Sequence, residues 1–181
     1  MARQLWLLRH AEAEPHGARA DAQRRLTERG ERQARAVGIA LARMQASFEA
    51  VLFSPKARAR QTAELAAERW SAEQRELLSA HPPLAGGFDA GQALHEMAAV
   101  SADGRLLLVG HEPDLSGVAG ELTGGRVDLK KGGLAVLRLD DPGCELVLLL
   151  RPRELALIAG DVFAPGDEGT ARAGRSPLGG E

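Results

Sequence analysis

The chain alternates between short apolar runs and segments with helical periodicity. Five runs have the length and composition of buried strands: residues 5–8, 51–53, 106–109, 134–139 and 145–150. The last two flank Asp140-Asp141-Pro142-Gly143, which predicts a tight turn between paired strands. Helical segments separate most of the other runs. This alternation predicts an α/β fold, with a largely parallel central sheet between two layers of helices.

Helix signals follow the first two runs. Thr27 offers an N-cap, and the apolar residues behind it recur at spacings of three and four, which predicts one buried helix face: Ala34, Val37, Leu41, Met44 and Phe48. Ser54 and Pro55 predict the cap and the first residue of a second helix that reaches about Trp70. Arg58 then lies in its first turn, where backbone N–H groups favour an anion.

The second half of the chain continues the pattern. Residues 75–80 predict a short strand and residues 90–100 a helix. Asp114 predicts the cap of a helix over residues 115–122, and a last helix begins near Pro152. The breaker-rich residues 164–181 predict a disordered tail after one domain over residues 1–163.

Composition argues against a nucleic-acid-binding, membrane-spanning or secreted protein. The net charge is −2 and no segment shows dense Lys/Arg clustering, so we expect no nucleic-acid partner. No apolar stretch approaches the length of a membrane span, and the first apolar run is too short for a secretory signal. A lone cysteine, Cys144, favours a reducing compartment, and we expect a cytoplasmic protein.

Three predicted strand ends carry the candidate chemistry. Arg9 and His10 follow the first run, Arg58 follows the second after four residues, and His111 follows the third. Since ligands of open α/β sheets bind beyond the carboxyl ends of the strands, these four side chains are expected to converge. Arginine forks two N–H bonds onto phosphate oxygens, and a neutral imidazole can attack phosphorus. The set therefore predicts a phosphoryl-transfer site.

Motifs around these residues have a matching order and spacing. They are Leu7-Leu8-Arg9-His10-Ala11, Leu26-Thr27 with Gly30 and Gln33, Ser54-Pro55 with Arg58 and Gln61-Thr62-Ala63, and Val109-Gly110-His111-Glu112-Pro113. The chain thereby resembles the histidine phosphatase superfamily and, within it, the small SixA-type phosphohistidine phosphatases. The resemblance implies a phosphoglycerate mutase-like, three-layer fold. It also implies that His10 is the transiently phosphorylated nucleophile and that Arg9, Arg58 and His111 bind phosphate.

The sequence departs from the superfamily pattern in two respects. Ala11 stands where glycine is commoner, which matters only if the backbone needs a positive φ there. The acidic proton donor of the larger relatives has no identifiable equivalent, and the short segment between Arg58 and His111 predicts no large cap domain. An open pocket without a strong acid favours phosphohistidine on a phosphotransfer protein, because its imidazole can leave as a neutral molecule.

Two other functions are compatible with the sequence. A small-molecule phosphomonoesterase could draw its acid from the loop that carries Glu12, Glu14, His16, Arg19 and Asp21, although a solvated loop explains these residues equally well. A non-catalytic phosphate-binding module is the alternative of another class.

Three polar residues near the predicted site are interpreted as structural: Ser54 as a cap, Thr62 as a helix-facing hydroxyl and Glu112 as a loop carboxylate. No cofactor is expected, and no metal, because the histidines lack ligand spacing: His10, His16, His81, His95 and His111.

Overall fold

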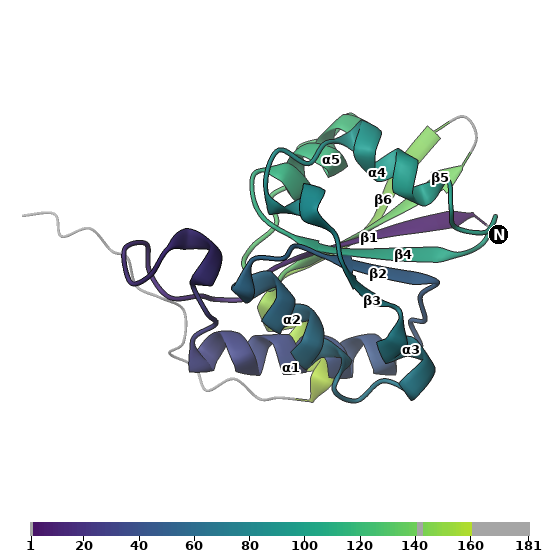
Figure 1. Cartoon of the computed structure of the whole chain (residues 1–181). Helices are drawn as coiled ribbons and strands as arrows, with labels where there is room; N and C mark the ends of the chain where they lie inside the picture. The colour runs from purple at the N-terminus through teal and green to yellow at the C-terminus, as the bar shows by residue number, and fades with distance from the viewer. Residues whose placement is uncertain (1, 141–142, 161–181) are drawn as a thin grey trace, which may run out of the picture.

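The computed structural model describes residues 2–140 and 143–160, and the tail predicted for residues 164–181 lies outside them. Its six-stranded sheet has the order β3-β2-β4-β1-β5-β6 (Figure 1). The strands are β1 (Arg3–Arg9), β2 (Ala50–Phe53), β3 (Leu78–Ala80), β4 (Arg105–Gly110), β5 (Leu134–Asp140) and β6 (Gly143–Leu150). The first four pair in parallel, and β5 and β6 add an antiparallel edge. The prediction of a largely parallel sheet is confirmed.

Helices cover both faces of the sheet (Figure 1). The helices on one side are α1 (Glu28–Arg43), α2 (Ala57–Ala67), α3 (Ala72–Glu76) and α6 (Pro152–Ala159); those on the other are α4 (Ala90–Met97) and α5 (Asp114–Thr123). Two 3₁₀ helices, η1 (Asp21–Gln23) and η2 (Pro82–Ala85), lie in the connections. Between α2 and β4 the described chain contains only the short elements α3, β3, η2 and α4, so no large cap domain lies there, as predicted.

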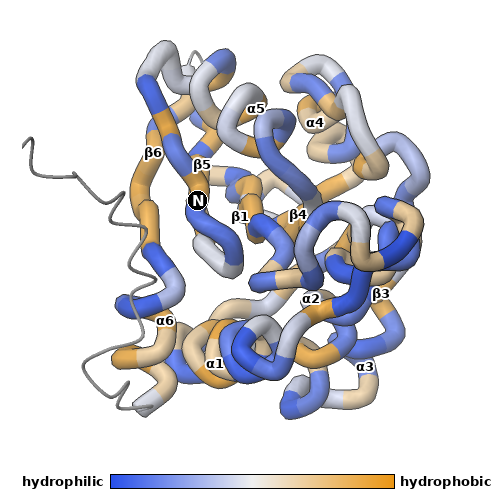
Figure 2. The backbone as a smooth tube through the Cα atoms, turned by 90° about the vertical axis from the view of Figure 1, so that its left-hand side faces the viewer, coloured by the Kyte–Doolittle hydropathy of each residue, from blue (hydrophilic) through white to orange (hydrophobic). Residues whose placement is uncertain are grey.

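Strand β1 shows why the central strands are almost wholly apolar. Leu5 and Leu7 pack in the cluster formed with α4 and α5, whereas Trp6 and Leu8 pack in the cluster formed with α1 and α2. Successive side chains of a strand point to opposite faces, so a strand covered on both faces needs apolar residues at every position. Figure 2 shows these hydrophobic strands between the two helix layers.

Helix α1 begins as predicted and ends earlier than predicted. The Thr27 hydroxyl accepts a hydrogen bond from the Gly30 N–H (3.1 Å), which confirms the cap. The helix ends at Arg43, and Gln45, with a φ of 53°, turns the chain. Phe48 is therefore not helical. It is still buried, and its ring packs edge-on against Trp6 with centroids 5.4 Å apart.

Both other predicted caps are wrong. Helix α2 begins at Ala57 with Lys56 at the N-cap and ends at Ala67, before Trp70. Ser54 does not cap it because the helix begins three residues further along the chain. The Ser54 N–H instead donates to the Val109 carbonyl (2.9 Å), which prolongs the pairing of β2 with β4. Asp114 is itself the first residue of α5, and its carboxylate accepts the Phe88 N–H (3.1 Å) instead.

The predicted strand over residues 75–80 is shorter than expected. Ser71 caps α3 by accepting the Gln74 N–H, and this helix takes up the first part of the segment. Only Leu78–Ala80 pairs with β2. The helix predicted over residues 90–100 is likewise shorter and ends at Met97. In the described part of the chain, none of the helices has the length and apolarity needed to cross a bilayer.

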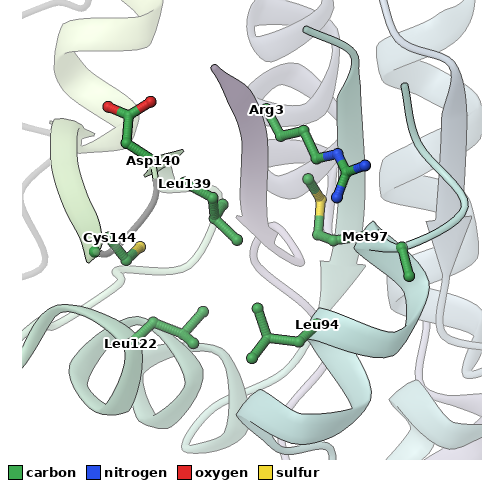
Figure 3. Close-up of a pocket in the computed structure, with 9 residues that line it drawn as sticks. Arg3, Leu94, Met97, Leu122, Leu139, Asp140 and Cys144 are labelled. Carbon is green, nitrogen blue, oxygen red and sulfur yellow. The ribbon is translucent and has the colours of Figure 1, made fainter. Parts of the chain in front are cut away.

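A cavity of about 460 Å³ opens at the amino end of β1 (Figure 3). The side chains of Leu94, Leu122 and Leu139 point toward its centre, whereas the Asp140 carboxylate points away. Its polar groups have protein partners, since Arg3 Nε donates to the Ser101 carbonyl (3.2 Å) and Asp140 pairs with Arg138 (2.7 Å). This end of the sheet offers an apolar hollow rather than a set of converging polar groups.

Candidate active site

A second cavity, of about 200 Å³, lies at the carboxyl ends of the parallel strands, and the four predicted side chains Arg9, His10, Arg58 and His111 all line it. Arg9 ends β1 and His10 follows it; His111 follows β4, and Arg58 is the second residue of α2. The His10 N–H donates to the Gly110 carbonyl (3.0 Å), which fixes the two strand ends side by side. The two imidazole centroids are 5.1 Å apart.

The hydrogen bonds of His10 define its tautomer. Nδ1 lies 2.7 Å from the Ala11 carbonyl oxygen, which can only accept, so Nδ1 carries the proton. Nε2 then has a free electron pair, and Arg58 Nε approaches it at 3.3 Å. Ala11 itself does not have a positive φ, so the missing glycine is tolerated. The arrangement presents an unprotonated ring nitrogen beside a guanidinium.

Burial keeps both imidazoles neutral. Burial lowers the pKa of His10 to about 3, and the charges of Arg58 and Arg9 act in the same direction against the opposing effect of the Ala11 carbonyl. Burial, with the charges of Arg58 and Lys56, also lowers the pKa of His111 to about 3. A neutral histidine is the form that can act as a nucleophile.

Asp21 of η1 holds the Arg58 guanidinium. Arg58 Nη1 donates to the Asp21 carbonyl (2.7 Å), and Nη2 donates to its carboxylate (3.3 Å). The same carboxylate pairs with Lys56 and Arg24, both at 2.9 Å. Hydrogen bonds from these two cations hold the pKa of Asp21 well below its usual range. Asp21 thus fixes the Arg58 side chain while remaining an anion.

Arg9 and His111 each use one nitrogen for a protein contact. Arg9 Nη1 donates to the Leu129 carbonyl (2.7 Å), and His111 Nε2 lies 2.8 Å from the Ser54 hydroxyl. Their other buried nitrogens, Arg9 Nε and His111 Nδ1, have no hydrogen-bond partner. Buried polar atoms in proteins are nearly always paired, so these two nitrogens are exceptions, and both belong to residues that line the pocket.

Side chains from α1 and α2 bind the backbone of the loop that follows His10. Thr62 Oγ1 accepts the Ala11 N–H (3.1 Å) and donates to the Arg58 carbonyl (2.7 Å). Gln33 accepts the Glu12 N–H (3.0 Å), and Gln61 accepts the Leu26 N–H (2.9 Å). These contacts give a structural reason for the threonine and glutamines of the motifs.

The glycine of the same motif allows a close approach. A Cβ atom at Gly30 would lie 1.9 Å from the Glu12 carbonyl oxygen, which no real side chain permits. The start of α1 can therefore lie directly against the loop, within reach of the Glu12 backbone. This contact completes the support of the segment behind His10.

The comparisons with known proteins agree with this geometry. Residues 5–79 match the family model of the histidine phosphatase superfamily, branch 1. The chain belongs to this superfamily. It is 35% identical over 140 residues to an uncharacterized protein of Picosynechococcus sp., an alignment that covers 75% of this chain and 84% of the relative.

Two solved structures of the superfamily are similar over most of the chain. A SixA protein from Nakamurella multipartitia is 31% identical, with a TM-score of 0.69, and the match covers 84% of this chain and 97% of that one. The protein histidine phosphatase SixA in complex with tungstate is 24% identical, with a TM-score of 0.73, and the match covers 84% and 99%. The SixA likeness suggested by the motifs is thus found in the structure as well.

Three residues of the candidate site were not assigned to it by the sequence. Ser54 contacts His111, Asp21 holds Arg58, and Glu112 lines the pocket. Ser54 and Glu112 follow strand ends just as His10 does, which is the signal that could have marked them. Among residues 2–140 and 143–160, no three His, Cys, Asp or Glu side chains are placed to hold a metal ion.

Proposed function

We propose that this protein is a phosphatase that removes phosphate from phosphohistidine on a phosphotransfer protein, through a phosphorylated His10. The observation that carries the proposal is the unprotonated Nε2 of His10, held beside Arg58 in a pocket that Arg9 and His111 also line. A nucleophile and several anion-binding groups in one pocket are what phosphoryl transfer requires.

In the first step, Arg9, Arg58 and His111 bind the phosphoryl oxygens, and His10 Nε2 attacks phosphorus. The P–N bond of the substrate breaks as the new P–N bond forms. The substrate imidazole departs with the electron pair and can leave as a neutral ring. A phosphate dianion beside His111 favours the protonated ring, so anion binding is expected to take up a proton there.

In the second step, water attacks the phosphorus of phosphorylated His10. The P–N bond breaks, its electron pair returns to Nε2, and inorganic phosphate is released. The Nδ1 hydrogen bond to the Ala11 carbonyl keeps the ring in one orientation through both steps.

Two observations favour a protein substrate. No large cap domain lies between α2 and β4 in the described structure, so nothing from this region closes over a bulky partner. The second is the structural likeness to a protein histidine phosphatase. A phosphomonoesterase acting on small molecules is the second candidate, because the pocket also contains the carboxyl group of Glu112, which an alkoxide leaving group would need.

The test is a parallel assay. The purified chain is incubated with a phosphohistidine-loaded phosphotransfer protein and, separately, with sugar phosphates and phosphoserine. We expect the highest kcat/KM with the phosphohistidine protein. Faster turnover of the small esters would transfer the assignment to the phosphomonoesterase, and absence of turnover on every substrate would leave a phosphate-binding module.

A further inference from the structure

The loop between α5 and β5 brings a lysine to the rim of the candidate active site. Lys131 lines the cavity together with His10, Arg58 and His111. Those three residues are buried, whereas Lys131 is exposed. Its ammonium group is therefore placed where a substrate enters, outside the set of side chains proposed to bind the phosphoryl oxygens.

The backbone of this loop is fixed to the strand end that carries His10. The Gly132 N–H donates to the carbonyls of Arg9 (3.1 Å) and His10 (3.0 Å). In the opposite direction, the Arg9 N–H donates to the Gly133 carbonyl (3.1 Å). Gly132 has a φ of 72°, a conformation that glycine adopts without strain. The backbone at Lys131 thus keeps a set position relative to the proposed nucleophile.

The two adjacent lysines of the loop differ in their partners. Lys130 Nζ pairs with the Asp128 carboxylate (2.6 Å), and Lys130 is not one of the residues that line the cavity. The Lys131 ammonium has no hydrogen bond or ion pair with any residue in 2–140 or 143–160. One lysine is thus compensated within its own loop, and the other presents an uncompensated charge at the rim.

The arginines that line the same cavity all have protein partners. Arg24 Nη2 pairs with the Asp21 carboxylate (2.9 Å), and Arg58 Nη1 donates to the Asp21 carbonyl (2.7 Å). Arg9 Nη1 donates to the Leu129 carbonyl (2.7 Å). Within the described chain, Lys131 is therefore the cation of the cavity that is most available to a group outside the protein.

An available ammonium at the rim matches a carboxylate on the substrate. The cavity measures about 200 Å³, so a phosphohistidine inserts its side chain and the surrounding residues of its protein lie against the rim. Lysine attracts an anion as a flexible point charge and needs no fixed bidentate geometry. Charge complementarity of this kind contributes mainly to the choice of partner and to the rate of encounter.

We propose that Lys131 is a specificity-determining residue that binds an acidic side chain beside the phosphohistidine of the protein substrate. The inference rests on the proposed function and adds the chemical character of the partner, which carries a carboxylate next to the phosphorylated ring. Lys131 takes no part in the bond-making steps at His10.

The experiment uses phosphohistidine peptides that differ only in the residues on both sides of the phosphorylated ring, which are Glu, Gln or Lys. Exposed charge pairs contribute little, so we expect the wild-type chain to hydrolyse the Glu peptide with a kcat/KM about three- to fivefold above that of the Gln peptide. The Lys peptide should be the poorest substrate. The preference should decrease with added salt, because the Debye length is only about 8 Å at 0.15 M ionic strength.

Three variants assign this preference to one side chain. Lys131→Met should hydrolyse the Glu and Gln peptides with equal kcat/KM, and the change on the Glu peptide should appear in KM, because the lost contact does not involve the reacting atoms. Lys131→Glu should reverse the order and prefer the Lys peptide. Lys130→Met removes the same charge from the same loop and should keep the wild-type preference. Thermal melting of each variant checks that it is folded.

Three results would overturn the inference. They are equal hydrolysis of all peptides by the wild-type chain, an undiminished preference in Lys131→Met, and a preference lost equally in Lys130→Met, which would indicate the overall charge of the loop. Failure of the proposed function has a different signature, since the wild-type chain would then hydrolyse no phosphohistidine substrate, peptide or protein. Turnover of the peptides without a preference would refute this inference alone.

Discussion

The two ends of the sheet carry cavities of opposite character. The cavity at the amino ends, about 460 Å³, is more than twice as large as the one at the carboxyl ends, about 200 Å³. In the larger one, Arg3 and Asp140 already have protein partners. In the smaller one, Arg9 Nε, His111 Nδ1 and Glu112 Oε1 belong to lining residues and have none. Uncompensated polar groups, rather than volume, distinguish the candidate site.

Parallel strands produce this asymmetry. At the carboxyl ends of β1 and β4 the chain leaves the sheet with Arg9, His10 and His111, and the start of α2 adds Arg58. At the opposite ends the neighbouring side chains are mainly aliphatic, from α4, α5 and β5. One end of the sheet thus carries histidines and arginines, and the other carries mainly aliphatic side chains. Substitutions at each end can test whether only the first end contributes to activity.

The largest effect is expected from His10→Ala. Removing Nε2 removes the nucleophile, so turnover and covalent phosphoryl labelling should both be lost. Steady-state assays and acid-labile labelling of the wild type and the variant measure this directly. Near-wild-type turnover without His10 would eliminate the covalent mechanism.

Arg58→Ala should reduce kcat/KM by about 10²–10³-fold, the size typical of one deleted charge-stabilising donor. It also removes a positive charge that lowers the pKa of both histidines, so both should titrate at higher pH. Kinetics and NMR titration of the imidazoles would show the two effects together. Unchanged histidine titration would mean that Arg58 does not contribute to keeping the rings neutral.

The free energy of unfolding should depend on pH in a way that shows both histidines to be neutral in the folded protein. Their folded-state pKa of about 3 lies below the value of about 6.5 in an unfolded chain. Between these values the unfolded state binds more protons, so the free energy of unfolding falls as the pH decreases from about 6.5 toward about 3, by about 1.4 kcal/mol per pH unit for each histidine. His111→Gln should make this decline shallower in urea unfolding measured at several pH values. Parallel curves for wild type and variant would contradict the neutral state of His111.

The smallest effect is expected at the other end of the sheet. Leu94, which lines the larger cavity and is 45% exposed, has no link to the candidate site. Leu94→Ala should leave kcat/KM within about twofold of the wild type and stability within about 0.5 kcal/mol, as is usual for surface substitutions. A marked loss of activity would show that the two ends are coupled.

Periodicity and strand-end position predicted the sheet, the helix layers and the convergence of Arg9, His10, Arg58 and His111. These features follow from local patterns and from the rule that parallel strands end at one edge. Apart from the ends of several elements, the errors concern side chains that interact with partners distant in sequence. Ser54 is an acceptable helix cap in isolation, but β4 engages its backbone and His111 its hydroxyl.

Asp21 and Glu112 illustrate the same limit. As a loop residue, Asp21 gives no sign that three cations surround it, because Arg58 and Lys56 come from a separate part of the chain. Glu112 resembles any loop carboxylate until burial and the Ser116 contacts are known. Protonation states depend on surroundings that assemble only in the folded protein.

The way the segment after His10 is attached has an evolutionary consequence. Gln33, Gln61 and Thr62 hold its main chain through N–H groups, which every residue except proline possesses. Mutations at exposed positions such as Pro15 and His16 can therefore accumulate without shifting His10, the proposed nucleophile. Selection can retune which molecules this enzyme family accepts by changing the rim while the reaction centre stays the same.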